Sequence, residues 1–580
     1  MIIKARKIQN DQRFTSLAVI LYILAFIVVG RLLILQIFNF DYYTALAINT
    51  HEIYQQLFPK RGNIYIQDSR SGKDQLYPVS VERPFYLLYA VPRDIAPNSV
   101  ATTTDFLAGL LKFDDEQKKI LSAQLSKKND PYEPIVDKLT QETAEIIKQA
   151  GLAGINLATK NYRYYSENKL VSNVVGFVGS DTDGNLSGRY GIEGGWDSEL
   201  AGKSGFLAVN KGALGSIISL AGKTEQTSEN GADLVLTIDR SLQDISCESL
   251  RQGVATYQAQ SASLIMLDAQ TGAILAMCSY PDFDPNNYAK VSSASAYNNT
   301  AIFTAYEPGS VFKPITMAMA LDLNAVGPDT LFNDPGVRVI DNYKVYNALK
   351  KQYGTITMTQ VLENSVNTGM IWVEEKIGNN AFEDYVKKFG FGQKLGIKMD
   401  GEVDGNISSL EKKSDIYFAN ASFGQGITAT PLQLVASYTA LANGGQMLKP
   451  YIIKEVRYAN GKVEKTIPQT IGNVISQRAQ KLITGMLISV VENGAGYVSV
   501  KMPEYYVAGK TGTAQIAGPG GYTEETNHTF IGYFPATDPR FIMLVKYEKP
   551  QRAWAESTAA PTFKKVADFA VDYYNLKGDK

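Results

Sequence analysis

The stretch AYEPGSVFKPITMAMALDL, at residues 305–323, places the hydroxyl of Ser310 and the amine of Lys313 three residues apart, just after a Pro-Gly pair. A long apolar run follows, and Pro314 fits the first turn of a helix, where its missing N–H costs least. Side chains three residues apart share one face of a helix, and the first turn carries unpaired backbone N–H groups. The stretch therefore predicts a helix that begins near Ser310 and brings a serine and a lysine together for chemistry.

The composition of the whole chain limits what this chemistry can be. The 580 residues are 45% hydrophobic and 20% charged, which is typical of a folded protein with several domains. The 57 Lys and Arg residues nearly balance the 58 Asp and Glu residues, so we expect no nucleic-acid partner. Two cysteines and two histidines are too few for a structural metal site. His51 and His528 lie in no setting typical of a Ser-His-Asp triad, so a serine enzyme would need another base.

The Ser-x-x-Lys spacing occurs at Ser166, Ser310 and Ser409, so it is weak evidence alone. Only Ser310 combines it with the Pro-Gly pair and the start of an apolar helix. A lysine activates a serine only as a neutral amine, and both a helix N-terminus and a second cation nearby disfavour its charged form. Lys510, in the predicted strand YYVAGKTGTAQI, offers that second cation.

A third motif lies between these two along the chain. The stretch ENSVNTGM holds Ser365 and Asn367 two residues apart, a spacing that recurs at two other places and is uninformative alone. The order of Ser310, then Ser365, then Lys510 makes the combined set specific.

The pattern of strands and helices around the motifs indicates the fold class. A polar stretch at residues 222–233 precedes runs rich in β-branched residues, after which helical patterns follow and strand patterns return. This order favours an α+β sandwich, with helices packed against an antiparallel sheet. The predicted strands lie at residues 232–243, 262–281, 505–514 and 529–546, and the predicted helices lie at 311–324 and 431–442, with a helical, charged insert near 101–150.

The N-terminal segment predicts a membrane anchor. Residues 14–38 are mostly apolar and carry one charge, Arg31, and this length can span a bilayer. Basic residues dominate residues 1–13, so the positive-inside rule places this tail in the cytoplasm. A cleaved signal peptide is the alternative, but its small-x-small site at residues 45–47 lies too far beyond the apolar core. We therefore expect a single-pass protein of the cell membrane with an extracytoplasmic catalytic domain.

Together, Ser310-x-x-Lys313, Ser365-x-Asn367 and Lys510-Thr511-Gly512 resemble the three active-site motifs of penicillin-binding proteins and serine β-lactamases. Between the anchor and about Phe563, the chain resembles the class B, monofunctional penicillin-binding proteins of the division-transpeptidase type. The blocks that carry this resemblance are Arg61-Gly62-Asn63-Ile64, GRYGIEGGWDSELAGKSG from Gly188, LTIDRSLQ from Leu236, DAQTGAILAM from Asp268, ASFGQGITATPLQL from Ala421 and HTFIGYFPATDPR from His528. One departure is RGNIYIQDSRSG, where Ile66 and Gln67 stand as if inserted into the family pattern.

The resemblance implies an α+β chain in which a single transmembrane helix and a mixed α/β pedestal precede a transpeptidase domain of the penicillin-binding and serine β-lactamase type. The implied parts are a cytoplasmic tail at 1–13, the anchor at 14–38, a dimerisation-like pedestal at 39–221, a linker at 222–233 and the transpeptidase domain at 234–575. The implied function is a peptidoglycan D,D-transpeptidase that cross-links stem peptides and requires no metal or organic cofactor. The implied partners are a D-Ala-D-Ala donor peptide, an amine acceptor peptide, β-lactams and a membrane glycosyltransferase.

The same resemblance implies roles for the motif residues. Ser310 attacks the D-Ala-D-Ala carbonyl, Lys313 takes its proton, and Ser365 relays a proton toward the leaving D-alanine. The backbone N–H groups of Ser310 and Thr513 form the oxyanion hole.

The remaining motif residues are implied to bind substrate. Asn367 hydrogen-bonds the peptide, and Lys510 supplies positive potential. Thr511 and Thr513 lie near the terminal carboxylate, with Gly512 between them on a strand along which a stem peptide can add as a further strand.

Other functions share parts of this pattern. A β-lactamase or β-lactam sensor has the same motifs, but the predicted tail is short for signalling, and Glu363, the acid nearest a motif, does not share a helix face with Ser365. An inert scaffold of a cell-wall synthesis complex is the non-enzyme alternative, which the intact motifs disfavour. Residues 41–230 show no acidic constellation of a glycosyltransferase. The sequence leaves open whether the protein acts in division, elongation or sporulation, and which diamino acid accepts the acyl group.

Two further expectations concern the packing of the chain. We expect Cys247 and Cys278 to be buried small apolar residues and not a disulfide. The family pattern suggests that Arg61 and Glu193 pair in the pedestal.

Overall fold

The computed structural model describes residues 52–57, 59–69, 75–128, 130–180, 186–210, 224–518 and 521–580, and five residues between 19 and 26. These residues fall into two units, Met1–Lys60 with Gly202–Asn230 and Arg61–Ala201 with Gly231–Lys580. Most of the predicted anchor at 14–38 lies outside the described residues. Within the described part of the chain, no helix has the length and apolar character needed to cross a membrane.

The first unit contains a small antiparallel sheet in the order β1-β8-β9. Its strands are β1 (Glu52–Leu57), β8 (Gly205–Asn210) and β9 (Thr224–Gln226). β9 falls inside the segment 222–233 that the sequence predicts as a linker, so part of that segment is a paired strand.

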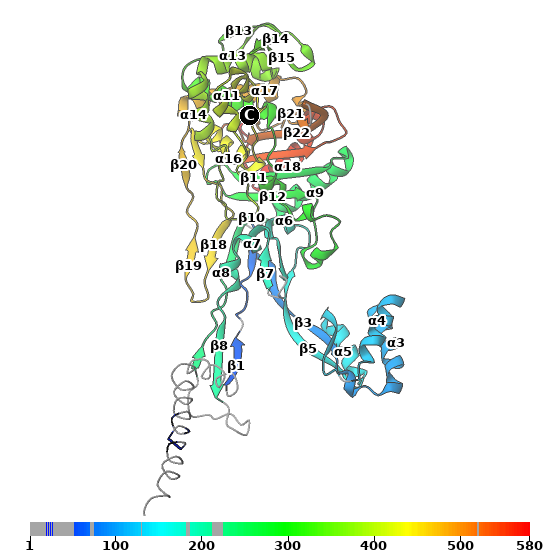
Figure 1. Ribbon diagram of the computed structural model, residues 1–580. Coiled ribbons are helices and arrows are strands. Elements are labelled where there is room, and N and C mark those ends of the chain that lie inside the picture. The colour runs from blue at the N-terminus through cyan, green and yellow to red at the C-terminus, as the bar shows by residue number, and fades with distance from the viewer. Residues whose placement is uncertain are drawn as a thin grey trace, which may run out of the picture. The chain divides into compact units, whose positions relative to one another are not determined.

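A mixed sheet of seven strands forms one part of the second unit (Figure 1). Its path is β19-β18-β10-β2-β3-β4, and β5 pairs with β3 away from this path. β2 and β10 run parallel, whereas the other neighbours are antiparallel. The strands are β2 (Ile64–Asp68), β3 (Gln75–Ala90), β4 (Glu133–Leu139), β5 (Ile155–Tyr165), β10 (Asp233–Asp239), β18 (Ile453–Arg457) and β19 (Val463–Lys465).

Three helices form a separate small core with the C-terminal part of β3. They are α3 (Val100–Leu111), α4 (Asp115–Leu125) and α5 (Gln141–Gln149), and they fill much of the insert that the sequence predicts as helical. Leu107, Leu121 and Ile147 point into this core and are buried.

The charged pair that the family pattern suggests is present. Glu193 lies fully buried in α7 (Gly191–Gly195), and its carboxylate pairs with Arg61 and Arg163 at 2.7 Å each. Burial raises the pKa of Glu193, but the two guanidinium groups outweigh this effect, so the net shift is downward. The predicted pair is confirmed, and Arg163 is a second partner that the sequence did not suggest.

The departure from the family pattern lies within strand β2. Ile66 is fully buried in the core, and Gln67 Nε2 donates a hydrogen bond to Leu236 O of β10 (2.9 Å). The side chains of both apparently inserted residues therefore pack within the sheet and do not reach the three active-site motifs.

Five antiparallel strands in the order β12-β11-β23-β22-β21 form the other large sheet of this unit (Figure 1). α9 and α18 pack against this sheet and against each other, and α16 packs against its central strands. The elements are β11 (Ser261–Asp268), β12 (Ile274–Tyr280), β21 (Ala508–Gly518), β22 (Gly521–Phe534), β23 (Phe541–Glu548), α9 (Arg240–Tyr257), α16 (Pro431–Ala442) and α18 (Ala559–Tyr573). The predicted α+β class, with helices on an antiparallel sheet, is confirmed.

Most predicted elements of this part are present, with two differences. Residues 240–243, predicted as the end of a strand, form the first turn of helix α9. The predicted helix at 431–442 has the same bounds as α16. The run at 529–546, predicted as one strand pattern, contains parts of two strands, β22 and β23. Pro535 and Pro539 lie between them, and proline cannot donate to a ladder, which explains the break.

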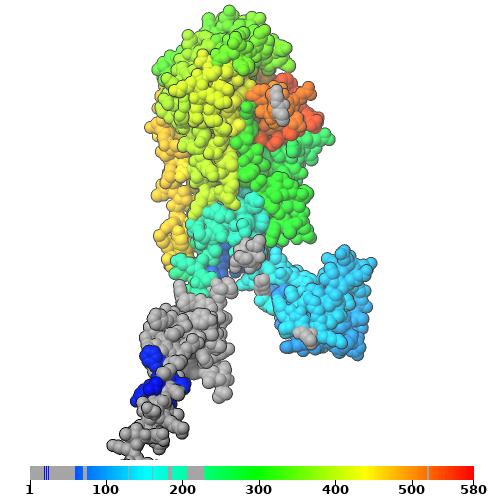
Figure 2. Space-filling model, viewed as in Figure 1, coloured from blue at the N-terminus to red at the C-terminus, as the bar shows by residue number. Residues whose placement is uncertain are grey.

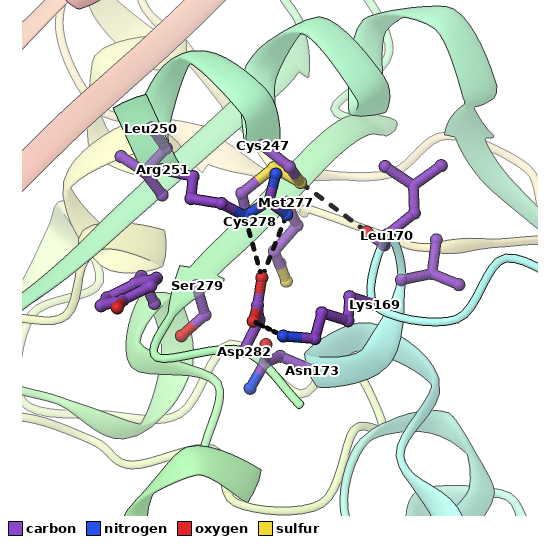
Figure 3. A pocket seen from close by; sticks show the side chains of 12 residues that line it. Lys169, Leu170, Asn173, Cys247, Leu250, Arg251, Met277, Cys278, Ser279 and Asp282 are labelled. Carbon is purple, nitrogen blue, oxygen red and sulfur yellow. Dashed lines mark hydrogen bonds and ion pairs between the residues drawn. A yellow bond between two sulfur atoms is a disulfide. The ribbon is translucent and has the colours of Figure 1, made fainter. Parts of the chain in front are cut away.

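We expected Cys247 and Cys278 to be unpaired, and this expectation is wrong because they form a disulfide (Figure 3). α9 packs on β12 and brings the two Cα atoms to 5.2 Å, within the usual range for a disulfide. The two residues are 31 apart in sequence, so their spacing did not reveal this contact. Beside the disulfide, Asp282 forms ion pairs with Lys169 (3.4 Å) and Arg251 (3.0 Å), as Figure 3 shows.

Candidate active site

Ser310 lies in η6 (Gly309–Phe312), a short turn of 3-10 helix that leads directly into α11 (Lys313–Asp322). Gly309 has a φ of +58°, and its N–H donates to Gly424 O (2.9 Å). Only glycine adopts such a φ readily, so this residue sets the direction in which the chain enters the helix. The predicted helix start is confirmed, with Ser310 in the turn just before the α-helix.

Lys313 is fully buried at the beginning of α11. Its Nζ lies 2.6 Å from Ser365 O, 3.0 Å from Ser365 Oγ and 2.7 Å from Asn367 Oδ1. Ser365 Oγ in turn lies within hydrogen-bond distance of Ser310 Oγ, at 3.0 Å. The structure therefore brings the first two motifs together, and Ser365 links the lysine to the serine.

The environment of Lys313 favours a neutral amine. Burial is the main cause that lowers the pKa of Lys313 well below its usual value, and repulsion from Lys510 lowers it further. The sequence predicted a helix N-terminus and a second cation as the causes. The second cation, Lys510, is confirmed, whereas burial, the larger cause, was not predicted.

Ser365 lies in the turn between α12 (Met358–Glu363) and α13 (Asn367–Ile377) and has a φ of +53°. A residue other than glycine in this region of φ is uncommon and is held by its surroundings. Asn367 Nδ2 donates to Tyr346 O (2.9 Å), which fixes the amide with its oxygen toward Lys313.

A buried carboxylate that sequence analysis missed supports this turn. Asp334, at the end of β13 (Leu331–Asp334), accepts a hydrogen bond from Thr368 Oγ1 (2.5 Å), and Thr368 directly follows Asn367. Asn347 joins them, because its Oδ1 accepts from Thr368 N (3.0 Å) and its Nδ2 donates to Asp334 Oδ2 (2.9 Å). No spacing in the sequence connects these residues with the motif.

The third motif lies on the edge strand β21, next to the turn that carries Ser310. A Cβ added to Gly512 would lie 3.0 Å from Val311 Cγ1 and 3.1 Å from Pro308 O, so the missing side chain allows the close approach. Lys510 is 1% exposed, and its Nζ donates to Tyr497 Oη (3.0 Å). In the space-filling view this strand layer, in orange, lies beside the yellow-green helical part (Figure 2).

The two threonines of the strand also have partners. Thr511 Oγ1 lies 2.7 Å from both Tyr497 Oη and Glu556 Oε1. Thr513 Oγ1 accepts a hydrogen bond from Ala555 N (3.1 Å). Tyr497 and Glu556 were not found from the sequence, because they lie outside the three motifs.

The residues considered as alternative catalytic groups lie outside this site or already have hydrogen-bond or ion-pair partners. The two ring nitrogens of buried His528 lie within hydrogen-bond distance of Thr526 and Thr558, and burial lowers its pKa to about 4. The Ser166 hydroxyl donates to a backbone carbonyl, whereas Lys169 pairs with the partly buried carboxylate of Asp282.

An antiparallel sheet flanked by helices, with a serine, a buried lysine and a Lys-Thr-Gly strand in one site, defines the penicillin-recognising serine enzymes. Family models agree with this class. The penicillin-binding protein transpeptidase domain matches residues 262–568, and the penicillin-binding protein dimerisation domain matches residues 56–236. The chain therefore belongs to the class B penicillin-binding proteins.

Several known proteins are similar over most of the chain. Stage V sporulation protein D of Bacillus subtilis is 32% identical over 85% of this chain and 75% of its own length. Peptidoglycan D,D-transpeptidase FtsI of Escherichia coli is 29% identical over 97% of this chain and 91% of its own length. The crystal structure of penicillin-binding protein 2X from Streptococcus thermophilus has a TM-score of 0.73 and 23% identity, and covers 90% of this chain and 81% of that chain. This last similarity shows the fold.

Proposed function

We propose that the chain is a peptidoglycan D,D-transpeptidase that cross-links stem peptides through an acyl-Ser310 intermediate. The observation that carries the proposal is the connection from buried Lys313 through Ser365 to Ser310. The names of relatives such as FtsI support peptidoglycan as the substrate.

The contacts of Lys313 indicate how the serine loses its proton. Ser365 O and Asn367 Oδ1 can only accept, so a neutral amine donates its two N–H groups to them. Its lone pair is then left for the Ser365 hydroxyl, and the Ser365 oxygen accepts the proton of Ser310. In this arrangement both hydroxyls point toward Lys313, so the proton of Ser310 reaches the base through Ser365.

Acylation then proceeds with a balanced transfer. Ser310 Oγ forms a bond to the carbonyl carbon of the D-Ala-D-Ala amide while Lys313 becomes protonated. The amide C–N bond breaks, and the nitrogen of the leaving D-alanine takes a proton back along the same path. Backbone N–H groups of Ser310 and Thr513 stabilise the oxyanion.

Deacylation repeats the exchange with a second peptide. The acceptor amine attacks the acyl carbon, the ester bond to Ser310 breaks, and the serine oxygen regains a proton. Asn367 and Lys510 orient the donor peptide and its carboxylate, and the strand from Lys510 through Gly512 to Thr513 pairs with the peptide backbone. A β-lactam acylates Ser310 in the same way.

The other functions considered are less well supported. Hydrolysis needs a carboxylate that holds a water, and Glu363 accepts instead a hydrogen bond from Ser489 Oγ (2.5 Å). An inert scaffold would not need a buried, neutral Lys313 beside Ser310.

Labelling with a fluorescent penicillin tests the proposal. Ser310→Ala should abolish labelling, whereas Ser166→Ala and Ser409→Ala, at the other two Ser-x-x-Lys sites, should leave it unchanged. After a pulse, the label should persist, and an added amine acceptor should speed release of the acyl group of a thioester substrate. Labelling that survives Ser310→Ala, or rapid release without an acceptor, would contradict the proposal.

We infer the cellular location of the enzyme from its N-terminal sequence. Residues 14–38 anchor the chain in the cell membrane, residues 1–13 face the cytoplasm, and the transpeptidase domain at 234–575 lies outside, after a pedestal at 39–221. The natural partner is a membrane glycosyltransferase that supplies glycan strands. A chain without residues 1–40 should leave the membrane fraction and keep penicillin labelling, and retention in the membrane fraction would contradict the single anchor.

A further inference from the structure

A continuous set of hydrogen bonds connects the cation of the Lys-Thr-Gly motif to a carboxylate outside the three motifs. Lys510 Nζ donates to Tyr497 Oη at 3.0 Å. Tyr497 Oη lies 2.7 Å from Thr511 Oγ1, and Thr511 Oγ1 lies 2.7 Å from Glu556 Oε1. Lys510, Tyr497 and Thr511 are all buried. Glu556 therefore interacts with the interior of the site although it lies in another element, η10 (Ala555–Ser557).

One arrangement of the hydroxyl protons satisfies every bond in this set. A carboxylate only accepts, so the Thr511 hydroxyl donates to Glu556. Thr511 Oγ1 then accepts from the Tyr497 hydroxyl. Tyr497 Oη accepts from the Lys510 ammonium and from the Thr511 backbone N–H (3.2 Å). All the dipoles point the same way, from the ammonium to the carboxylate, and such aligned bonds strengthen one another.

The surroundings of Glu556 make Lys510 its main counter-charge. Its second oxygen, Oε2, is buried and has no hydrogen-bond partner among the described residues. A Cβ on Gly496 would lie 3.0 Å from Glu556 Cγ, so a glycine at this position leaves space for the side chain of Glu556. His528, on the neighbouring strand β22, is held neutral by burial, which lowers its pKa to about 4.

The other lysines on the elements around η10 have partners of their own, and Glu524 and Asp572 add only negative charge there. η10 packs against β21, β22, α18 and the turn that carries Tyr497. On these elements, Lys564 pairs with Asp568, Lys565 with Gln252, and Glu525 with Lys549.

We propose that Glu556 is a positioning residue that acts through Thr511 and Tyr497 to orient the Lys510 ammonium. The inference rests on the roles proposed above for Ser310, Lys313 and Lys510. A charged, fixed Lys510 repels a proton from Lys313 and attracts the carboxylate of the donor peptide.

The same arrangement of hydroxyl protons gives Thr511 and Thr513 different hydrogen-bonding roles. Thr511 gives its hydroxyl proton to Glu556, so in this state it has none to offer a substrate. Thr513 Oγ1 accepts from Ala555 N, which leaves its own hydroxyl proton for the substrate carboxylate. Thr511 therefore contributes to fixing Lys510.

The test is the pH profile of acylation of the full-length protein by a fluorescent penicillin. Glu556→Gln keeps an oxygen that accepts from Thr511 but removes the charge. The rate should rise with pH as Lys313 becomes neutral, and repulsion from Lys510 helps to lower the pKa of Lys313. We expect Glu556→Gln to move this rise by about half a pH unit toward higher pH, because a displaced Lys510 repels the Lys313 ammonium less.

A second variant keeps the test decisive if Glu556→Gln does not fold. Tyr497→Phe retains the carboxylate and interrupts the set of hydrogen bonds, so the rise of its rate with pH should move in the same direction. A merely structural role would lower the rate at every pH without moving the rise. An unmoved rise in a folded Glu556→Gln or Tyr497→Phe protein would overturn the inference.

Matched controls separate this result from general effects. Glu548→Gln removes another partly buried carboxylate of the same domain, one that pairs with Lys546. Tyr505→Phe removes a tyrosine hydroxyl that donates to Leu576 O (2.7 Å). Both controls should keep the pH at which the wild-type rate rises. If the wild type itself is not labelled at Ser310, the proposed function has failed, which is a different outcome from an unmoved rise.

Discussion

Replacing Asp334 by asparagine tests how the Ser365 turn is held in place. The fully buried carboxylate accepts hydrogen bonds from Thr368 Oγ1 (2.5 Å), Asn347 Nδ2 (2.9 Å) and two backbone N–H groups (2.8 and 2.9 Å). Asparagine keeps one acceptor oxygen and turns an NH2 group toward these donors, so at least two bonds are lost. Bonds to a charged group contribute about 1.5–3 kcal/mol each, so the free energy of unfolding should fall by about 3–6 kcal/mol.

Acylation should also slow, because Thr368 directly follows Asn367, which contacts Lys313. A shift of the turn by a fraction of an ångström should reduce the rate by about tenfold to a hundredfold. The assays are denaturant unfolding in detergent and penicillin labelling at pH 7. Asp341→Asn is the matched control, because this exposed carboxylate accepts from Ser414 Oγ (2.7 Å) away from the motif. Wild-type stability and labelling in Asp334→Asn would refute the reasoning.

The same variant predicts a pH dependence. Burial raises the pKa of Asp334, but its hydrogen bonds outweigh this effect and the net shift is downward. A lowered pKa gives stability that is present above the ordinary aspartate value of about 3.9 and is lost as the pH falls through the folded-state value. The difference in unfolding free energy between wild type and Asp334→Asn should therefore be full at pH 7 and shrink below about pH 4.

Two further changes test the packing of the domain. Gly512→Ala should slow labelling by at least about tenfold, because the added Cβ would lie 3.0 Å from Val311 Cγ1, beside Ser310. The control Gly472→Ala should not slow labelling, because no atom lies within 4 Å of its added Cβ. Equal labelling rates for the two variants would contradict the close approach of β21 to the Ser310 turn. Joint replacement of Cys247 and Cys278 by alanine should lower the free energy of unfolding by about 3–4 kcal/mol, because the disulfide joins residues 31 apart in sequence. A reductant should lower the melting temperature of the wild type but not that of the double variant. A wild-type melting temperature that does not respond to reductant would contradict the disulfide.

Local patterns of sequence predicted the elements but not their contacts. The helix after Ser310 and the helix α16 follow from runs of apolar residues bounded by proline, which are properties of neighbouring residues. The disulfide depends on how α9 packs against β12. Nothing near Cys247 or Cys278 in the sequence reports that packing.

The same limit applies within the site. Ser310, Ser365 and Lys510 could be predicted because the order of their motifs is itself a signal. Asp334 and Glu556 could not, because each acts through one hydrogen bond to a residue next to or within a motif. A carboxylate at these positions is indistinguishable in the sequence from one on the surface.

The two buried lysines show why such supporting residues are needed. Moving a charged amine out of water costs several kcal/mol unless the amine is paired or loses its proton. Lys313 Nζ is surrounded by the oxygens of Ser365 and Asn367, with no carboxylate among the described residues within hydrogen-bond distance, so it avoids this cost by becoming neutral. The hydrogen bonds of Lys510 lead instead to the carboxylate of Glu556, which provides a counter-charge. The sequence supplies two similar cations, and the partners that surround each of them decide which one acts as the base.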